Sequence, residues 1–112
     1  MVTIDSSPFG SPSRTRVLKF LRLLGDSFPR ELSRLTGTRL SAIQKALASL
    51  ERDGMVAGRS VGRTRMYSLD PRFFASRELD RLLARLTSAD PEMMRAVEGL
   101  RRRPRRAGKP VS

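Results

Sequence analysis

The sequence predicts a mainly α-helical domain that carries one small β-hairpin. Most of the 112 residues fall into segments whose apolar side chains recur every three or four positions, which is the spacing of one helix face. One stretch in the middle of the chain instead holds two strand-like runs joined by glycine and basic residues, a pattern typical of a hairpin. The expected helices lie near residues 13–24, 29–36, 40–53, 72–86 and 91–103, and the expected strands at 55–59 and 65–69.

The first expected helix, residues 13–24, is apolar over more than half of its circumference. Only Arg16, Lys19 and Arg22 form a polar stripe, so this helix is expected to be buried on two sides. Gly25 ends the helix, because glycine accepts the backbone conformation of a helix cap. The preceding residues 1–12 are rich in Ser, Pro and Gly and are expected to form a flexible arm.

Two helices separated by a tight turn follow. We expect the first of them to begin with Ser27 as its cap, Pro29 in its first turn and Glu31 near its positive end. Thr36-Gly37 ends it after about two turns, and the next helix begins near Leu40. The inner faces of this pair are expected to be formed by Leu32, Leu35, Ile43, Leu47 and Leu50.

The two strand-like runs flank a five-residue connection, residues 60–64, of hairpin length. We call this hairpin, expected over residues 55–69, the wing. The order of helix, turn, helix and wing predicts a winged helix-turn-helix domain that binds DNA. This domain is expected to span residues 13–87 and to include a C-terminal dimerisation helix.

Two further helices are expected after the wing. Asp70-Pro71 is expected to cap the helix at 72–86, and Asp90-Pro91 an additional amphipathic helix within residues 88–103. Residues 104–112 form a basic tail that is expected to be disordered. This tail is equally consistent with nonspecific phosphate binding and with a solubilising role.

The net charge of +12, from 23 basic and 11 acidic residues, indicates an anionic partner. Residues 101–112 carry six basic and no acidic residues, which is half of that excess. The chain has no Cys and no His, so thiolate and imidazole ligands or bases are excluded, and no metal or cofactor is expected. The sequence shows no stretch expected to span a membrane and no signal segment, so we predict a cytoplasmic protein. It also shows no group of residues typical of an active site, so we predict that the protein is not an enzyme.

The candidate DNA-binding side chains lie on the third helix and at the wing tip. Gln44 suits the adenine edge, Lys45 and Arg39 suit guanine, and Ala42 suits the thymine methyl group. The full predicted set is Thr38, Arg39, Ser41, Ala42, Gln44, Lys45, Arg63 and Arg65. Possible phosphate contacts are Arg30, Arg34 and Arg59; the arginines at 59, 63 and 65 share a side of the hairpin only if its register permits.

A homodimer is the expected assembly. The leucines of the fourth helix recur at helical spacing, and the first helix has apolar residues on two sides, so both helices are expected to pack against a second copy. Such a pairing would set two reading helices about 34 Å apart on a palindromic operator. The predicted interface residues are Val17, Phe20, Leu24, Leu79, Leu82, Leu83 and Leu86.

Specific motifs resemble the ArsR-like winged-helix transcriptional regulators. They are Phe28-Pro29-Arg30-Glu31-Leu32, Leu35-Thr36-Gly37, Ala42-Ile43-Gln44-Lys45-Ala46-Leu47, Leu50-Glu51-Arg52-Asp53-Gly54-Met55-Val56 and the segment from Gly62 to Pro71. Phe9-Gly10-Ser11 resembles the subgroup found beside genes for small nucleotidyltransferases. The resemblance covers residues 9–86 and implies a homodimeric, sequence-specific regulator, most simply a repressor. Arg39 and Leu40 stand where the family has Ser or Thr followed by Pro, and the missing Cys and His speak against metal sensing.

Two other binding functions compete with DNA reading. The chain is alternatively a protein-interaction module, for example for a nucleotidyltransferase, with secondary DNA affinity. RNA binding ranks third, because only Tyr67 and a few core-like Phe residues are available to stack on bases.

Overall fold

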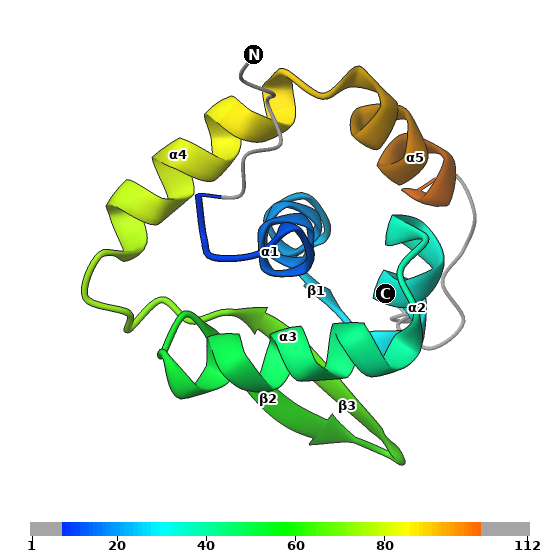
Figure 1. The fold of residues 1–112 in the computed structure, drawn as a ribbon, viewed down its shortest axis with the longest axis vertical. Coiled ribbons are helices and arrows are strands. Elements are labelled where there is room, and N and C mark those ends of the chain that lie inside the picture. Colours follow the sequence, from blue (N-terminus) through cyan, green and yellow to red (C-terminus); the bar gives the residue numbers. More distant parts are fainter. Residues whose placement is uncertain (1–7, 102–112) are drawn as a thin grey trace, which may run out of the picture.

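Helix α1, residues Pro12–Leu24, lies at the centre of the fold, and the other elements surround it (Figure 1). The computed structural model describes residues 8–101. The remaining elements are β1 (Asp26–Ser27), α2 (Pro29–Thr36), α3 (Leu40–Arg52), β2 (Val56–Val61), β3 (Thr64–Leu69), α4 (Ser76–Ser88) and α5 (Pro91–Arg101). The predicted mainly α-helical domain with a small hairpin is confirmed. The predicted tail at 104–112 and the last two residues of the predicted fifth helix lie outside the described residues.

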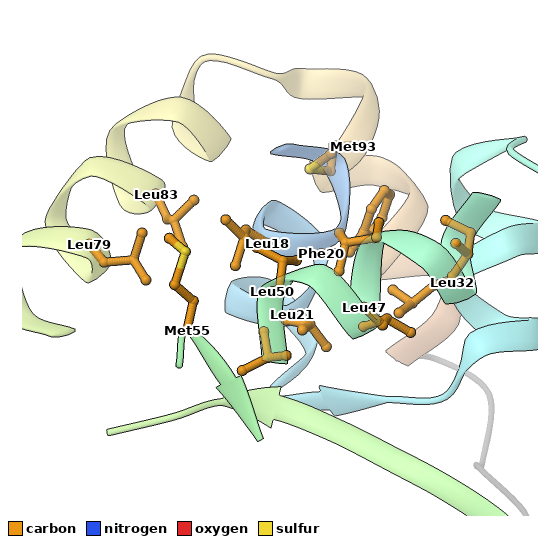
Figure 2. Close-up of a cluster of buried hydrophobic side chains, with 14 of the residues drawn as sticks. Leu18, Phe20, Leu21, Leu32, Leu47, Leu50, Met55, Leu79, Leu83 and Met93 are labelled. Atoms are coloured by element: carbon orange, nitrogen blue, oxygen red, sulfur yellow. The ribbon is translucent and has the colours of Figure 1, made fainter. Parts of the chain in front are cut away.

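The core is built on α1, which packs against α3 on one side and α4 on the other. Its leucine and phenylalanine side chains interdigitate with those of the neighbouring helices (Figure 2). Leu18, Leu47 and Leu83, one from each of these helices, are fully buried. Burial of each such side chain stabilises the fold by about 1.5–3 kcal/mol. Because α1 has apolar side chains on two sides, it gains most from this burial when other elements cover both of them, as they do at the centre of the fold.

Helix α1 begins at Pro12, inside the stretch expected to form a flexible arm, and residues 8–11 lead directly into it. Ser11 is the N-cap of α1, and its Oγ accepts a hydrogen bond of 3.1 Å from the Arg14 N–H. Pro12 takes the first helical position, where its missing N–H costs nothing. Phe9 packs against the core and anchors the segment. Residues 1–7 of the predicted arm lie outside the described part of the chain.

Ser27 does not cap α2 as predicted. It belongs to β1, a two-residue strand that pairs with β3 and was not expected. Its fully buried hydroxyl donates to Glu31 Oε1 at 2.6 Å. The N-cap position of α2 is instead Phe28, which makes no capping side-chain bond, and Pro29 follows it in the first turn. The carboxylate of Glu31 therefore lies inside the fold and not at its surface.

The wing is longer and its turn tighter than the sequence predicted. Strands β2 and β3 pair up to Val61 and Thr64, which leaves only Gly62 and Arg63 as the turn. Gly62 has a φ of +65°, the left-handed conformation that two-residue hairpin turns require. Together with β1 the hairpin forms an antiparallel sheet of order β1-β3-β2.

Helix α4 begins at Ser76, four residues later than predicted, because Asp70 forms a turn and caps no helix. Asp70 Oδ1 accepts the Arg72 N–H at 2.9 Å, which closes a tight turn at the end of β3. The N-cap position of α4 is Ala75, which makes no side-chain cap. The cap predicted for the next helix is confirmed, since Asp90 Oδ1 accepts the Met93 N–H at 3.1 Å.

Candidate nucleic-acid interface

The turn between α2 and α3 is held by three local features. Gly37 has a φ of +68°, which lets the chain reverse directly after α2. Ser33 Oγ donates to the Thr38 carbonyl at 2.6 Å, and the Thr38 N–H donates to Thr36 Oγ1 at 3.2 Å. These bonds fix the angle at which α3 leaves the turn. The α3 N-cap, Arg39, makes no side-chain cap, in keeping with its departure from the Ser or Thr of the family pattern.

Helix α3 presents one exposed polar stripe and one buried apolar face. Ile43, Leu47 and Leu50 are fully buried and anchor the helix in the core. The exposed stripe consists of Ser41, Gln44, Lys45, Ala48 and Arg52. The sequence prediction included the first three and missed Ala48 and Arg52, although the spacing of four residues from Gln44 to Ala48 and from Ala48 to Arg52 indicates the same face. Of the other predicted residues, Arg39 is exposed, whereas Thr38 and Ala42 are half-buried.

The surface formed by α2 and the first half of α3 is positively charged. Arg30 and Arg34 are exposed on α2, and the structure gives them no ion pair within residues 8–101. Glu31, the acidic residue between them, is buried against Ser27. Residues 32–50 contain no acidic residue. The basic side chains of this surface are therefore available to an external anion.

The register of the wing separates two arginines that the sequence had grouped. Arg59 pairs with Met66, and Arg65 pairs with Ser60, so the two arginines point to opposite faces of the hairpin. Arg59 lies on the outer face, where its Nη2 is 3.1 Å from Asp26 Oδ2. Arg63 lies in the turn itself and is exposed, with no ion pair among the described residues.

Arg65 lies on the face of the hairpin that carries the buried Val56. Its Nη2 donates to Glu51 Oε2 of α3 at 3.0 Å, and its guanidinium lies 5.6 Å from the centre of the Tyr67 ring. The hydrogen bond to Glu51, followed by the neighbouring Tyr67 side chain, raises the pKa of the Arg65 guanidinium. The sequence showed neither contact, because each depends on how the hairpin packs against α3.

The wing tip and the beginning of α3 lie toward the same end of the molecule, at the lower right of Figure 1. Helix α2 lies at that end as well, whereas α4 lies at the opposite side of the view. Helix α2, the beginning of α3 and the wing tip therefore lie toward one end of the molecule. This arrangement suits a long polyanion that runs past both a helix and a hairpin.

Among solved structures, the chain is similar to the adhesin competence repressor AdcR from Streptococcus pyogenes. The superposition has a TM-score of 0.61 with 16% sequence identity and covers 85% of this chain and 67% of the AdcR chain. The fold is a winged helix. No protein-family model matches the chain, and no curated protein matches it in sequence.

Four of the seven residues predicted for the dimer interface pack inside the single chain. Val17 and Leu83 are fully buried there, and Phe20 and Leu79 are 3% and 7% exposed. Their helical spacing was real, but it reflects the packing of α4 against α1. Leu82 is 42% exposed, and Leu24 and Leu86 are half-buried, so these three remain candidates.

Two further sequence expectations concern metals and membranes. Within residues 8–101, no three acidic, His or Cys side chains are grouped so that they could hold a metal ion. None of the helices described in the structure has the length and apolar character needed to cross a membrane.

Proposed function

We propose that this protein is a sequence-specific regulator that binds double-stranded DNA as a homodimer. The observation that carries the proposal is the exposed polar stripe of α3, anchored by a fully buried opposite face beside a basic hairpin tip. A helix presented in this way enters the major groove, and the wing contacts the backbone or the minor groove. The winged-helix fold, shared with a repressor, and the ArsR-like motifs, including those of the nucleotidyltransferase-associated subgroup, support this function.

The residues of the interface divide into base readers and phosphate contacts. Gln44 pairs with adenine, Lys45 and Arg39 with guanine, and Ser41 with either base or with phosphate. Thr38 and Ala42 contribute at the edge of the contact, since their side chains are half-buried. Arg30 and Arg34 of α2 contact phosphate, and Arg63 contacts the minor groove or the backbone.

A dimer doubles these contacts and thereby raises the affinity for DNA expected of so small a chain. Two copies related by a two-fold axis present their α3 helices about 34 Å apart, which matches successive major grooves and predicts a palindromic site. Occupation of such a site within a promoter blocks transcription, so the proposed regulator is a repressor.

The test is binding to the duplex upstream of the protein's own gene, compared with a scrambled duplex, over a series of salt concentrations. We expect a preference of about 10³-fold or more for the specific duplex. Gln44→Ala and Lys45→Ala, which each remove a proposed base reader, should reduce the preference by about 5- to 150-fold. Arg34→Ala, which removes a proposed phosphate contact, should instead lower the slope of log affinity against log salt by about 1. Arg81→Ala, which removes an exposed arginine of α4, is the matched control. Equal, steeply salt-dependent binding to both duplexes would contradict the proposal.

A second candidate function is docking to another protein, with DNA affinity secondary. The observation that favours it is a set of exposed apolar side chains on and near the C-terminal helices, where Phe74 is 92%, Leu82 42% and Met94 43% exposed. Exposed apolar residues that form a patch mark protein contacts. A stable complex with a nucleotidyltransferase, lost in a Phe74→Ser variant, would favour this function.

A further inference from the structure

Arg65 joins the wing to α3. Its Nη2 donates to Glu51 Oε2 at 3.0 Å, so one ion pair connects β3 with the last turns of the helix that carries the proposed base readers. Glu51 follows Gln44 by seven residues, which places the two side chains about two turns apart on one side of α3. The ion pair therefore lies directly beside the exposed stripe.

The position of the Arg65 guanidinium is prepared by its neighbours on the hairpin. The register pairs Gly58 with Tyr67 and Ser60 with Arg65, so all four residues share one face. The guanidinium lies 5.6 Å from the centre of the Tyr67 ring. A Cβ atom at Gly58 would lie 2.8 Å from Arg65 Nε and 2.9 Å from its Cζ and Nη2. The absence of a side chain at Gly58 thus provides the space in which the guanidinium lies.

These contacts give Arg63 and Arg65, two of the three arginines of the wing, different roles. Arg63, in the turn, has no ion pair within the described residues and is free to meet an external phosphate. Arg65 is bonded through its Nη2 to Glu51, whose negative charge offsets that of the guanidinium, so Arg65 is less available to a phosphate than Arg63 is. The sequence had placed both arginines among the DNA contacts.

We propose that Arg65 is a positioning residue that fixes the angle between the wing and α3, and that Arg63 is the cation through which the wing contacts DNA. The inference rests on the proposed DNA-binding function and assigns Arg65, Glu51 and Gly58 a part in it. A fixed angle lets the wing and α3 engage the duplex together, without a loss of conformational freedom on binding.

The decisive variant is Gly58→Ala, which displaces the Arg65 guanidinium without changing any charge. We expect it to weaken specific DNA binding by about three- to fivefold, as Arg65→Ala does, with an unchanged salt slope in both cases. Arg63→Ala should instead lower that slope by about 1.

Double variants test whether these residues act through one contact. The double variant Gly58→Ala/Arg65→Ala should bind no worse than Arg65→Ala alone, because both changes remove the same ion pair with Glu51. The charge reversal Glu51→Arg/Arg65→Glu should restore most of the affinity that either reversal alone removes.

The opposite pattern would overturn the proposal. If Arg65 contacts phosphate directly, Arg65→Ala lowers the salt slope by about 1, whereas Gly58→Ala, which frees the guanidinium from Glu51, leaves binding unchanged or tighter.

A second measurement needs no DNA. The chain has no cysteine, so spin labels attached through Val61→Cys on the wing and Ala48→Cys on α3 report the distance between the two elements. We expect a narrow distance distribution in the parent and a broader one after Gly58→Ala or Arg65→Ala. Equal widths would refute the positioning role even if DNA binding is confirmed. Failure of the parent to prefer any duplex would refute the proposed function, while the distance distributions still decide whether Arg65 holds the wing.

Discussion

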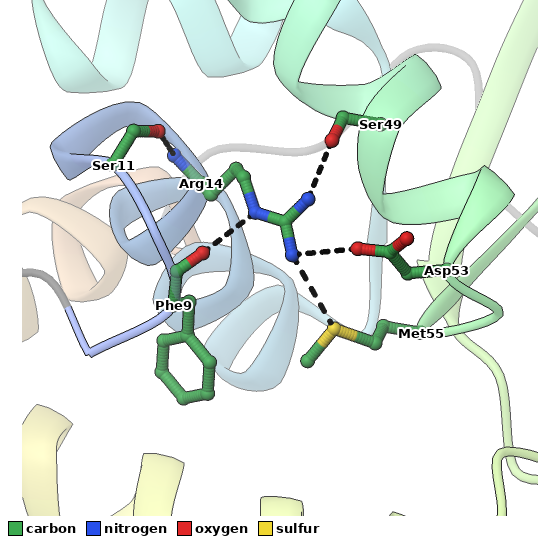
Figure 3. A network of polar contacts seen from close by, with 6 residues as sticks. All are labelled: Phe9, Ser11, Arg14, Ser49, Asp53 and Met55. Carbon is green, nitrogen blue, oxygen red and sulfur yellow. Dashed lines mark hydrogen bonds and ion pairs between the residues drawn. The ribbon is translucent and has the colours of Figure 1, made fainter.

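The guanidinium of Arg14, in the first turn of α1, lies 2.9 Å from the carboxylate of Asp53, directly after α3. The same side chain donates to the Phe9 carbonyl at 2.7 Å and to the hydroxyl of Ser49 (Figure 3). One arginine therefore ties the segment before α1 to the C-terminal end of α3. The start of the chain and the helix proposed to read DNA are thus held in one polar network.

Replacement of Arg14 should loosen this connection. Arg14→Ala removes a charged donor with three hydrogen-bond partners, Met55 Sδ being the third, and an ion pair, and it leaves a half-buried site. We therefore expect a loss of about 1–3 kcal/mol in the free energy of unfolding. Denaturant unfolding measures this loss. The matched control is Arg16→Ala, an exposed arginine of the same helix, which should change stability by less than about 0.5 kcal/mol. Equal effects of the two substitutions would show that the network contributes nothing.

The buried pair of Ser27 and Glu31 supports a second prediction. Ser27→Ala removes the hydroxyl that donates to Glu31 Oε1 at 2.6 Å and leaves a buried carboxylate with one donor fewer. We expect this change to cost about 1–3 kcal/mol, measured by denaturant unfolding. Ser60→Ala, an exposed serine of β2, serves as control and should have little effect. A Ser27→Ala variant as stable as the parent would mean that Glu31 is satisfied without this hydroxyl.

Helical periodicity was a dependable guide to this fold, whereas side-chain capping was not. The leucines of α1, α3 and α4 predicted three buried faces, because each face is set by spacing within one segment. Ser27 and Asp70 were read as helix caps, yet one pairs with β3 and the other closes a turn. Both residues have the chemistry of a cap, and only the tertiary structure decides where their oxygen atoms are used.

The candidate site divides in the same way. The exposed stripe of α3 follows from its own sequence, so Ser41, Gln44 and Lys45 were predictable. The partners of Arg59 and Arg65 could not be predicted, because they depend on the register of the hairpin. That register is set by a two-residue turn, whereas the sequence had suggested a five-residue connection. The apolar spacing of α4 predicted a buried face correctly but gave no means to distinguish packing within the chain from packing between copies.

Two neighbouring leucines of α4 separate those two kinds of packing. Leu83 is fully buried, so Leu83→Ala should destabilise the fold by about 2–5 kcal/mol. Leu82 is 42% exposed, so Leu82→Ala should change the stability of the isolated chain by less than about 0.5 kcal/mol. If α4 also contacts a second copy, Leu82→Ala should shift the protein toward monomer in sedimentation equilibrium. A dimer indifferent to Leu82 would place the interface elsewhere.

Asp70 makes stability depend on pH in a defined direction. The Arg72 N–H, which donates to Asp70 Oδ1 at 2.9 Å, lowers the pKa of this carboxyl below its ordinary value of 3.8, and the Arg72 side chain adds to the effect. The unfolded chain therefore binds a proton at Asp70 at a higher pH than the folded chain does. The stabilisation is complete above the ordinary pKa and is lost as pH falls through the lower, folded-state pKa.

An Asp70→Asn variant should accordingly be less stable than the parent near neutral pH, and the difference should narrow as pH falls below about 4. Urea unfolding at a series of pH values measures this difference. The same comparison, with and without Asp70→Asn, can be made in an Arg72→Ala background. Arg72→Ala keeps the backbone N–H, which is the largest cause of the lowered Asp70 pKa, so the stability difference should still narrow at low pH. If Arg72→Ala abolished the narrowing, the side-chain ion pair would be the main stabilising contact of Asp70. A stability difference between Asp70→Asn and the parent that instead stayed constant with pH would contradict the prediction. It would mean that Asp70 has the same pKa in the folded and unfolded chains.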